Sequence, residues 1–283
     1  MQTNSTTSVA GPQPLVSCLC VTRNKPALLR RAIECFDAQN YTNRELVVIY
    51  EDDDVPTAQA LDEAAAANRS IRVVEVPCAP RLTLGQLRNL SVDAARGEFF
   101  CQWDDDDWYH AERISRQVDA AISNGQDACL LTNWIMFDEI SRQAYFSHFR
   151  LWEGSLLCRK KVWADGLVYP SLSRNEDNVF VDQLMWRGCA YPLVMAGLYI
   201  YTTHHNNTWP RKHFEEVFAR SQKLSPDATH LVEGILGGGM SHTEASAALR
   251  QEWFLRGLNY FATPAARALS TPGSAASAGP GTI

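Results

Sequence analysis

The chain has 283 residues, of which 46% are hydrophobic and 20% are charged, so it can bury the core of one large α/β domain or of a catalytic domain with a small appendage. Its formal net charge of −6 argues against a general nucleic-acid binder, because such proteins usually display a basic stripe. No apolar run approaches the ~20 residues of a membrane span, and residues 1–13 lack the basic start and apolar stretch of a secretory signal. We therefore expect no transmembrane segment, and a cytoplasmic protein that could still associate peripherally with the inner membrane surface.

Cysteine usage supports the same compartment. The sequence has eight cysteines, none of them in a Cys-x-x-Cys pair, and most of them lie within apolar runs. We expect reduced, buried thiols rather than a disulfide framework or a zinc site. The eight are Cys18, Cys20, Cys35, Cys78, Cys101, Cys129, Cys158 and Cys189.

The chain divides into a flexible start, a single domain and a tail. Residues 1–13 are polar, and residues 263–283 are rich in Ala, Ser, Pro and Gly without periodicity, which predicts disorder. We expect one catalytic domain over 14–262, with a first half at 14–108 and a second half at 109–262.

Strand and helix patterns alternate along the first half. Apolar runs predict strands at 15–22, 45–50, 71–76 and 98–103, and the intervening segments predict helices at 24–39, 56–68 and 84–96. Asn24 is expected to cap the first helix, with Pro26 in its first turn. This βαβαβαβ order is typical of an α/β fold with a mostly parallel central sheet and helices on both faces.

Three polar clusters fall at the ends of these strands: Thr22–Arg23, Glu51–Asp54 and Asp104–Asp107. In open parallel sheets, ligands bind beyond the carboxyl ends of the strands. We therefore expect the three clusters to converge on one site at that edge.

The second half is less regular. Its pattern predicts strands at 128–137, 144–149 and 191–201, and helices at 111–124, 176–187, 210–223 and 243–259. We expect these elements to complete the sheet and to build a second side of the site.

The sharpest motif is WDDDDW at 103–108, directly after a predicted buried strand. In an extended chain residues i and i+2 point the same way, so Asp104 and Asp106 should form one pair and Asp105 and Asp107 the other. Carboxylates this close repel one another unless a cation or proton intervenes, and oxygen-rich sites suit Mg²⁺ or Mn²⁺ bridging substrate phosphates. A solvated acidic loop is the alternative. The position after a buried strand, between two tryptophans, favours the metal site.

From this motif outward, the sequence resembles the family 2 glycosyltransferases, which have the GT-A fold. The resemblance covers about 15–215 and rests on the order and spacing of several segments. They are VSCLCVTRN at 16–24, ELVVIYEDD at 45–53, LGQLRNLSVDAARGEFFCQWDDDDW at 84–108, WEGSLLCRKKVW at 152–163, RNEDNVF at 174–180 and YTTHHNNTW at 201–209.

The resemblance implies a nucleotide-binding first half and an acceptor-binding second half. Asp104 and Asp106 match the metal-binding pair, with Mn²⁺ or Mg²⁺ as the cofactor, and His204 is either a third ligand or a surface histidine. The other implied donor contacts are Thr22, Arg23, Glu51 or Asp52, Arg88, Asp105, Trp152, Ser155 and Arg211. The family pattern continues with a Gly-Ser turn beside the sugar, which Gly154 and Ser155 match.

The acidic pair Glu176–Asp177 opens a predicted helix. The resemblance gives Asp177 the role of the base that takes the proton of the acceptor hydroxyl, with Glu176 beside it. Adjacent helix residues point in different directions, so only one of the two is expected to face the site. Ordinary acids favoured by the helix dipole are the alternative.

The implied function is metal-dependent, inverting transfer of a sugar from a nucleotide diphosphate, UDP or GDP, to an acceptor hydroxyl that the sequence does not name. A nucleotidyltransferase is one alternative, but it would normally have a Gly-rich loop after the first strand, and TRNKPALLRR at 22–31 has no glycine. A catalytically inactive scaffold is another, but it could lose its acids freely, whereas Asp104, Asp106 and Asp177 are all present.

Overall fold

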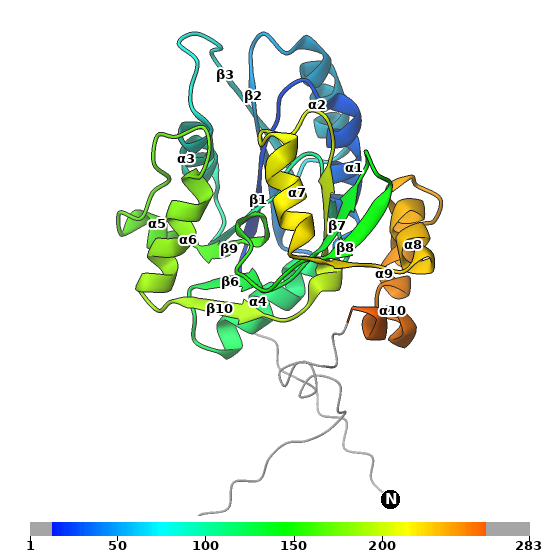
Figure 1. Cartoon of the computed structure of the whole chain (residues 1–283). Helices are drawn as coiled ribbons and strands as arrows, with labels where there is room; N and C mark the ends of the chain where they lie inside the picture. Colours follow the sequence, from blue (N-terminus) through cyan, green and yellow to red (C-terminus); the bar gives the residue numbers. More distant parts are fainter. Residues whose placement is uncertain (1–12, 259–283) are drawn as a thin grey trace, which may run out of the picture.

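The structure, a computed structural model, describes residues 13–258, which form two β-sheets with helices packed around them (Figure 1). The expectations for residues 1–12 and for the tail from 259 lie outside the described residues. Among residues 13–258, no helix combines the length and the hydropathy that crossing a membrane requires.

The larger sheet contains the four strands predicted in the first half. In spatial order its seven strands are β10 (Ala190–Leu193), β6 (Ala128–Leu131), β9 (Leu157–Arg159), β4 (Phe99–Gln102), β1 (Val16–Val21), β2 (Arg44–Glu51) and β3 (Ile71–Val76). Every pairing is parallel except those of β9 with β4 and with β6, which are antiparallel. The prediction of a mostly parallel central sheet is therefore confirmed.

Three helices connect the first four strands: α1 (Pro26–Asp37), α2 (Val55–Ala67) and α3 (Leu84–Ala94). Figure 1 shows α1 and α2 on one side of this sheet and α3 on the other, as right-handed crossovers require when the strand order reverses between β3 and β4. Capping defines two of these helices: Asp54 accepts from the backbone of Thr57, and Thr83 forms a capping box with Gln86.

The predicted cap of α1 is wrong. Its N-cap residue is Lys25, and no side chain caps the helix. Asn24 instead takes the left-handed conformation, with φ of 55°, and its backbone N–H donates to the Asp54 carboxylate. The chain turns sharply between β1 and α1 for this reason.

A second, smaller sheet was not expected. Its strands, in spatial order, are β12 (Gln222–Lys223), β8 (Gln143–Phe146), β7 (Ile135–Asp138), β11 (Tyr199–Thr203) and β5 (Trp108–Tyr109). The single strands predicted at 128–137 and 191–201 are each broken in two, because the chain leaves the first sheet after β6 and after β10 and enters the second sheet at β7 and β11.

The remaining helices surround both sheets. They are α4 (Arg113–Ser123), α5 (Lys160–Ala164), α6 (Glu176–Trp186), α7 (Arg211–Ala219), α8 (Pro226–Leu236), α9 (His242–Ala248) and α10 (Glu252–Gly257), with 3₁₀ turns η1 (Glu153–Ser155) and η2 (Ala196–Leu198). The helix predicted over 210–223 stops at Ala219, where the chain turns into β12. The helix predicted from 243 divides into α9 and α10.

The two sheets meet at the acidic run, because residues 103–107 join β4 of the first sheet to β5 of the second. Arg113 fixes this junction from inside the core. Its guanidinium is fully buried, lies 4.4 Å from the ring centroid of Tyr109 and 5.1 Å from that of Tyr199, and donates to the carbonyl oxygen of Gln102 at 2.8 Å. The loop that presents the acids therefore has a rigid base.

The cysteines behave as expected within the described residues. All eight are free thiols, and six of them are buried.

Candidate active site

A cleft of about 360 Å³ opens where the strand ends of the first sheet meet the second sheet. Seven of the side chains predicted for the site line it: Arg88, Asp104, Asp105, Asp106, Trp152, Glu176 and Asp177. The other predicted residues are Thr22, Arg23, Glu51, Asp52, Ser155, His204 and Arg211, and they lie outside its lining. The expected convergence of strand ends is thus largely observed.

The acidic run does not alternate as an extended chain would, because residues 105 and 106 form a turn. Lys25 Nζ lies 3.1 Å from Asp105 Oδ1 and 2.7 Å from Asp106 Oδ2, so these neighbours share one cation. Only Asp107 points away. It is fully buried, and it accepts hydrogen bonds from the hydroxyl of Tyr199 and, at 2.8 Å, from the backbone N–H of Thr202.

Burial and nearby charges shift the pKa values of these two aspartates in opposite directions. Burial raises the pKa of Asp105 to about 6, reinforced by the charge of Asp106 and opposed by Lys25. Burial also acts to raise the pKa of Asp106, but hydrogen bonds and charge from His204 and Lys25 outweigh it and bring that pKa to about 2. The pKa of Lys25 is raised, because Asp106 and Asp105 outweigh the effect of its burial. Asp106 is therefore the most strongly anionic group of the run.

His204 belongs to this cluster rather than to the surface. Its Nε2 lies 3.0 Å from Asp106 Oδ2, and only 8% of its side chain is exposed. The backbone N–H of Asn206 donates to its Nδ1 at 3.1 Å, which leaves Nε2 to face the carboxylate. A histidine nitrogen and a carboxylate oxygen at this separation form a suitable pair of ligands for a divalent metal ion.

Arg88 links the acidic run to α6. Its Nε lies 3.0 Å from Glu176 Oε1, and a terminal nitrogen lies 3.6 Å from Asp104 Oδ1. Glu176 is 2% exposed, whereas Asp177 is half-buried. Among residues 13–258, the one hydrogen bond to its carboxylate is local, from the backbone N–H of Asn178 at 2.8 Å. Asp177 is therefore the acid of this pair that is free to contact a ligand.

The predicted nucleoside side lies at the ends of β1 and β2. Thr22 Oγ1 donates to Asp105 Oδ2 at 2.6 Å, so its hydroxyl orients the acidic run. Arg23 pairs with both Glu51 and Asp53. These contacts tie the three predicted polar clusters into one network.

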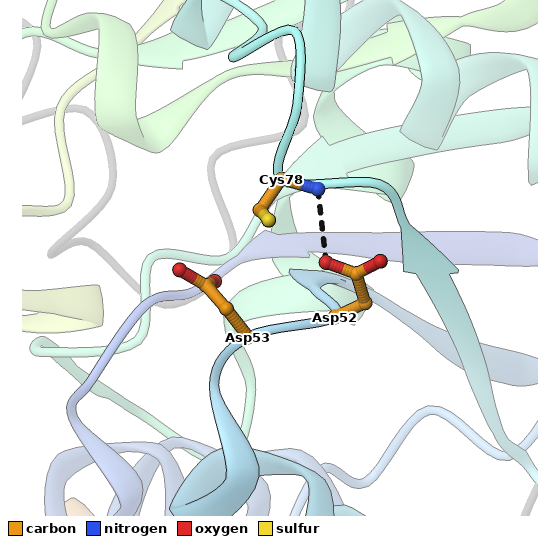
Figure 2. A group of neighbouring side chains, drawn as sticks. All are labelled: Asp52, Asp53 and Cys78. Atoms are coloured by element: carbon orange, nitrogen blue, oxygen red, sulfur yellow. Dashed lines mark hydrogen bonds between the residues drawn. The ribbon is translucent and has the colours of Figure 1, made fainter.

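Asp52 points toward the loop after β3, where its Oδ1 accepts from the backbone N–H of Cys78 at 3.0 Å (Figure 2). Within residues 13–258, Asp52, Asp53 and Cys78 are the one group of three His, Cys, Asp or Glu side chains whose ligand atoms all lie within 4.8 Å of one another. Asp52 and Asp53 are exposed, and Arg23 already neutralises Asp53. This cluster therefore lies at the ends of β2 and β3 and apart from the WDDDDW run.

One wall of the cleft is aromatic, and we define this aromatic wall by Trp134, Trp152, Tyr201, Trp209 and Phe214. Tyr201 lies on β11 of the second sheet, and Phe214 lies on α7. Trp134 stacks on Trp152 at 4.5 Å between ring centroids and on Tyr201 at 4.7 Å. Trp152, the tryptophan predicted for the site, therefore lines the cleft and also packs against a neighbouring ring.

Gly154 and Ser155 have different roles. A Cβ on Gly154 would lie 2.9 Å from the Tyr199 hydroxyl and 3.3 Å from Asp104 Oδ2, so the close approach inferred for this glycine is present. Ser155 is fully buried, donates to the carbonyl of Trp152 at 2.6 Å and accepts from the backbone of Leu131 at 2.8 Å. Its hydroxyl holds the turn and does not reach the cleft.

Arg211 is engaged elsewhere. It pairs with the buried carboxylate of Asp138, with 2.8 Å between a terminal nitrogen and Oδ2. It lines a second cavity of about 280 Å³, which also includes His204 and shares Arg174 and Trp209 with the main cleft.

Sequence reasoning missed Lys25, Arg150, Glu153 and Arg174, all of which line the cleft. Lys25 could have been found, because it lies three residues beyond the end of a predicted strand, at the same sheet edge as the acidic run. Nothing local marks the other three.

Solved structures of similar fold show the class of fold to which this chain belongs. The structure of S. aureus TarS in complex with UDP aligns with 72% of this chain and 70% of its own, at 17% identity and a TM-score of 0.57. The mannosyltransferase PcManGT from Pyrobaculum calidifontis, solved with GDP-Man and Mn²⁺, aligns with 92% of this chain and 77% of its own, at 15% identity and a TM-score of 0.56. The fold is thus the GT-A fold of glycosyltransferases, as expected.

The sequence itself places the chain in a family within that class. The sequence model described as "Glycosyl transferase family 2" matches residues 17–170, more than half of the chain. The protein belongs to glycosyl transferase family 2. A putative glycosyltransferase of Bacillus subtilis (strain 168), EpsH, is 26% identical over 108 residues, which cover 38% of this chain and 30% of EpsH.

Proposed function

We propose that this protein is a metal-dependent, inverting glycosyltransferase that takes its sugar from a nucleoside diphosphate and transfers it to an acceptor hydroxyl. The observation that supports this most is the cleft at the sheet edge that Asp106, Arg88 and Asp177 line together, with His204 in contact with Asp106. Similar folds solved with UDP and with GDP-Man and Mn²⁺ support the class of donor.

The first half of the chain would hold the nucleotide. Arg23 and its partners Glu51 and Asp53 form a polar edge at the ends of β1 and β2, suited to a ribose and a base. Asp52 lies close by, and its Oδ1 accepts from the backbone N–H of Cys78 (Figure 2). Either Glu51 or Asp52 can accept from a ribose hydroxyl, and Glu51 would have to share its carboxylate with Arg23.

The acidic run fits a divalent metal ion. The residues that would hold it are Asp106 and His204, with Asp104 beside them. They offer carboxylate oxygens and one imidazole nitrogen, a set of ligand atoms that suits Mn²⁺ and also accepts Mg²⁺. When bound, the metal would neutralise the charge of the leaving diphosphate. Lys25 would have to yield its place between Asp105 and Asp106, where its ammonium now balances the same charge.

Asp177 is the candidate general base. It lines the cleft, it is half-buried, and no cation pairs with it within 4 Å among the described residues. A carboxylate in this state can accept the proton of an acceptor hydroxyl as that oxygen attacks the anomeric carbon. Glu176 lacks this freedom, because Arg88 holds it. Direct attack from the side opposite the diphosphate would invert the anomeric configuration.

The test is a screen of UDP-glucose, UDP-N-acetylglucosamine and GDP-mannose for release of the nucleotide with and without Mn²⁺. We expect metal-dependent release from at least one donor. Asp106→Asn should lower kcat/KM by at least about a hundredfold, the order seen when a key electrostatic group is lost. Asp182→Asn, an exposed acid on α6, is the matched control and should behave as wild type.

The affinity for the nucleotide tests whether a metal ion takes part in binding it. Calorimetry with UDP and GDP should show tighter binding in Mn²⁺ than in EDTA, and Asp106→Asn should remove the difference. Equal affinity with and without metal would refute the metal assignment. The absence of release from every donor, in a protein that still binds the nucleotide, would leave a binding scaffold in place of an enzyme.

A further inference from the structure

The basic side chains of the cleft differ in whether a carboxylate pairs with them. Four lysine or arginine residues line it, and three of them lie within ion-pair distance of a carboxylate: Lys25 with Asp105 and Asp106, Arg88 with Glu176 and Asp104, and Arg150 with Glu153. Arg174 is the fourth. Among residues 13–258, no carboxylate lies within 4.0 Å of its guanidinium, so its positive charge is available to a ligand.

The backbone holds Arg174 at the cleft. The next residue, Asn175, takes the left-handed conformation with φ of 63°, and Asn178 Nδ2 donates to Asn175 Oδ1 at 3.1 Å. Non-glycine residues are uncommon in this region, and they persist where the surroundings enforce them, often at binding sites. The turn places Arg174 and Asp177, three residues apart, on the same cavity.

Arg174 contacts the aromatic wall. Its guanidinium carbon lies 5.8 Å from the ring centroid of Trp209, which stacks in turn on His213 at 4.5 Å. Phe214 and Val217 of α7 continue this apolar surface within the cleft. An arginine that rests on an aromatic ring keeps its forked N–H donors free for a carboxylate or a phosphate.

We propose that the acceptor carries an anionic group, a carboxylate or a phosphate, which Arg174 binds while the acceptor's apolar face rests on Trp209 and Phe214. This inference rests on the proposed function, because it concerns the second substrate of the same site. The anion would be held a short distance from the hydroxyl that Asp177 deprotonates. The acceptor class is therefore an acidic sugar or a phosphate-bearing ring or polyol, and neutral sugars are poor acceptors.

The position of Arg174 favours the acceptor over the donor. The proposed metal and diphosphate site lies at Asp104–Asp106, and Arg174 makes no ion pair there. It lies instead on the cleft that the candidate base also lines, and it contacts Trp209 of the aromatic wall. A residue of the diphosphate site and a residue of the acceptor site respond differently to substitution, which makes the assignment testable.

The experiment compares three probes that share one ring: glucose, glucuronate and glucose 6-phosphate. Their affinities are measured by calorimetry on the full chain in the presence of UDP and Mg²⁺. We expect glucuronate or glucose 6-phosphate to bind about tenfold more tightly than glucose, the effect of one charge-assisted hydrogen bond. Comparing the two charged probes distinguishes a carboxylate site from a phosphate site.

Arg174→Gln should remove this preference and leave the affinity for UDP unchanged. Arg174 is exposed, so the substitution leaves the fold intact. Arg187→Gln is the matched control, because Arg187 is an exposed arginine at the other end of α6 and should keep the preference.

Three results would overturn the inference: equal or undetectable binding of the charged and neutral probes to wild type, a preference that survives in Arg174→Gln, or a loss of UDP affinity in that variant. The last result would move Arg174 to the donor site. Failure of the proposed function looks different, because wild type would then release no nucleotide from any sugar donor. A chain that hydrolyses its donor without an anion preference refutes only the acceptor class.

Discussion

The two walls of the cleft differ in how their charges are satisfied. On the acidic wall, Lys25 and Arg88 neutralise the carboxylates, and Thr22 and His204 orient them. On the aromatic wall, stacked rings provide shape, and Arg174 has no carboxylate partner among the described residues. The carboxylates of the acidic wall already have cationic partners, so this wall suits a ligand that binds together with its own cation. The aromatic wall, with this arginine, suits an anionic ligand.

The largest effect should come from the residue between the walls. Asp177→Asn keeps the shape of the side chain but removes its ability to take a proton, so kcat should fall by about 10²–10⁴-fold. Metal and donor affinity should hardly change, since no contact joins Asp177 to Lys25 or Asp106. Steady-state kinetics with the donor and acceptor found by screening, together with calorimetry of the nucleotide, measure both quantities.

Glu176→Gln sharpens this comparison. It removes the charge that Arg88 pairs with, so donor affinity should change more than in Asp177→Asn, and kcat should change less. An Asp177→Asn enzyme that turns over at nearly the wild-type rate would remove Asp177 from the mechanism, and the half-buried acid would then have no assigned role.

A smaller effect should come from Lys25, the internal cation of the acidic wall. Lys25→Met removes the charge at similar volume, so Asp105 and Asp106 should repel one another and the free energy of unfolding should fall by about 1–3 kcal/mol. Mn²⁺ should then substitute for the lost ammonium. We expect a larger Mn²⁺-induced rise in Tm for the variant than for wild type, measured by differential scanning fluorimetry.

The control for this prediction is Lys161→Met, which removes a more exposed lysine that pairs with Asp127 at 2.9 Å. Its Mn²⁺ response should match wild type. A Lys25→Met variant whose Tm responds to Mn²⁺ no more than wild type would show that the metal and the lysine do not compete for the same carboxylates.

The two halves of the chain also differ in how much of their structure could be predicted from the sequence. The strands and helices of the first half are continuous, locally encoded patterns, and the acids at 104–107 directly follow a buried strand, so both the sheet and the acidic run were predictable. The position of Lys25 at the same sheet edge could also have been predicted, but its pairing with Asp105 could not, because Asp105 lies 80 residues away in the chain.

The second half was harder, because its strands change sheets within apolar runs. Residues 128–137 read as one strand, yet the chain leaves the first sheet after Leu131 and joins the second at Ile135. No glycine or proline marks the break. It is set by tertiary contacts: Asn133 Nδ2 donates to the carbonyl of Ser147 at 2.8 Å, and the ring of Trp134 stacks on Trp152. Arg174 and Glu153 depend on the same long-range packing.

The smallest predicted effect concerns Glu153, which lies between the walls and pairs with Arg150. Burial raises the pKa of Glu153 to about 7, although Arg150 opposes the shift. The folded state therefore holds a proton more tightly than the unfolded state, whose glutamate has a pKa of about 4.3. Stability from this group is present at low pH and is lost as the pH rises from about 4.3 to about 7, with no further change above that range.

Glu153→Gln should remove this dependence, because the amide does not ionise. Relative to wild type, the variant should gain in Tm between pH 5 and pH 8, by an amount that corresponds to about 1–2 kcal/mol after allowance for the Arg150 pair, which the variant weakens. Thermal melts of both proteins at pH 5, 6.5 and 8 measure the gap. A gap that stays constant across this range would mean that Glu153 is ionised throughout and that Arg150 fully offsets its burial, which would place this carboxylate with the balanced charges of the acidic wall.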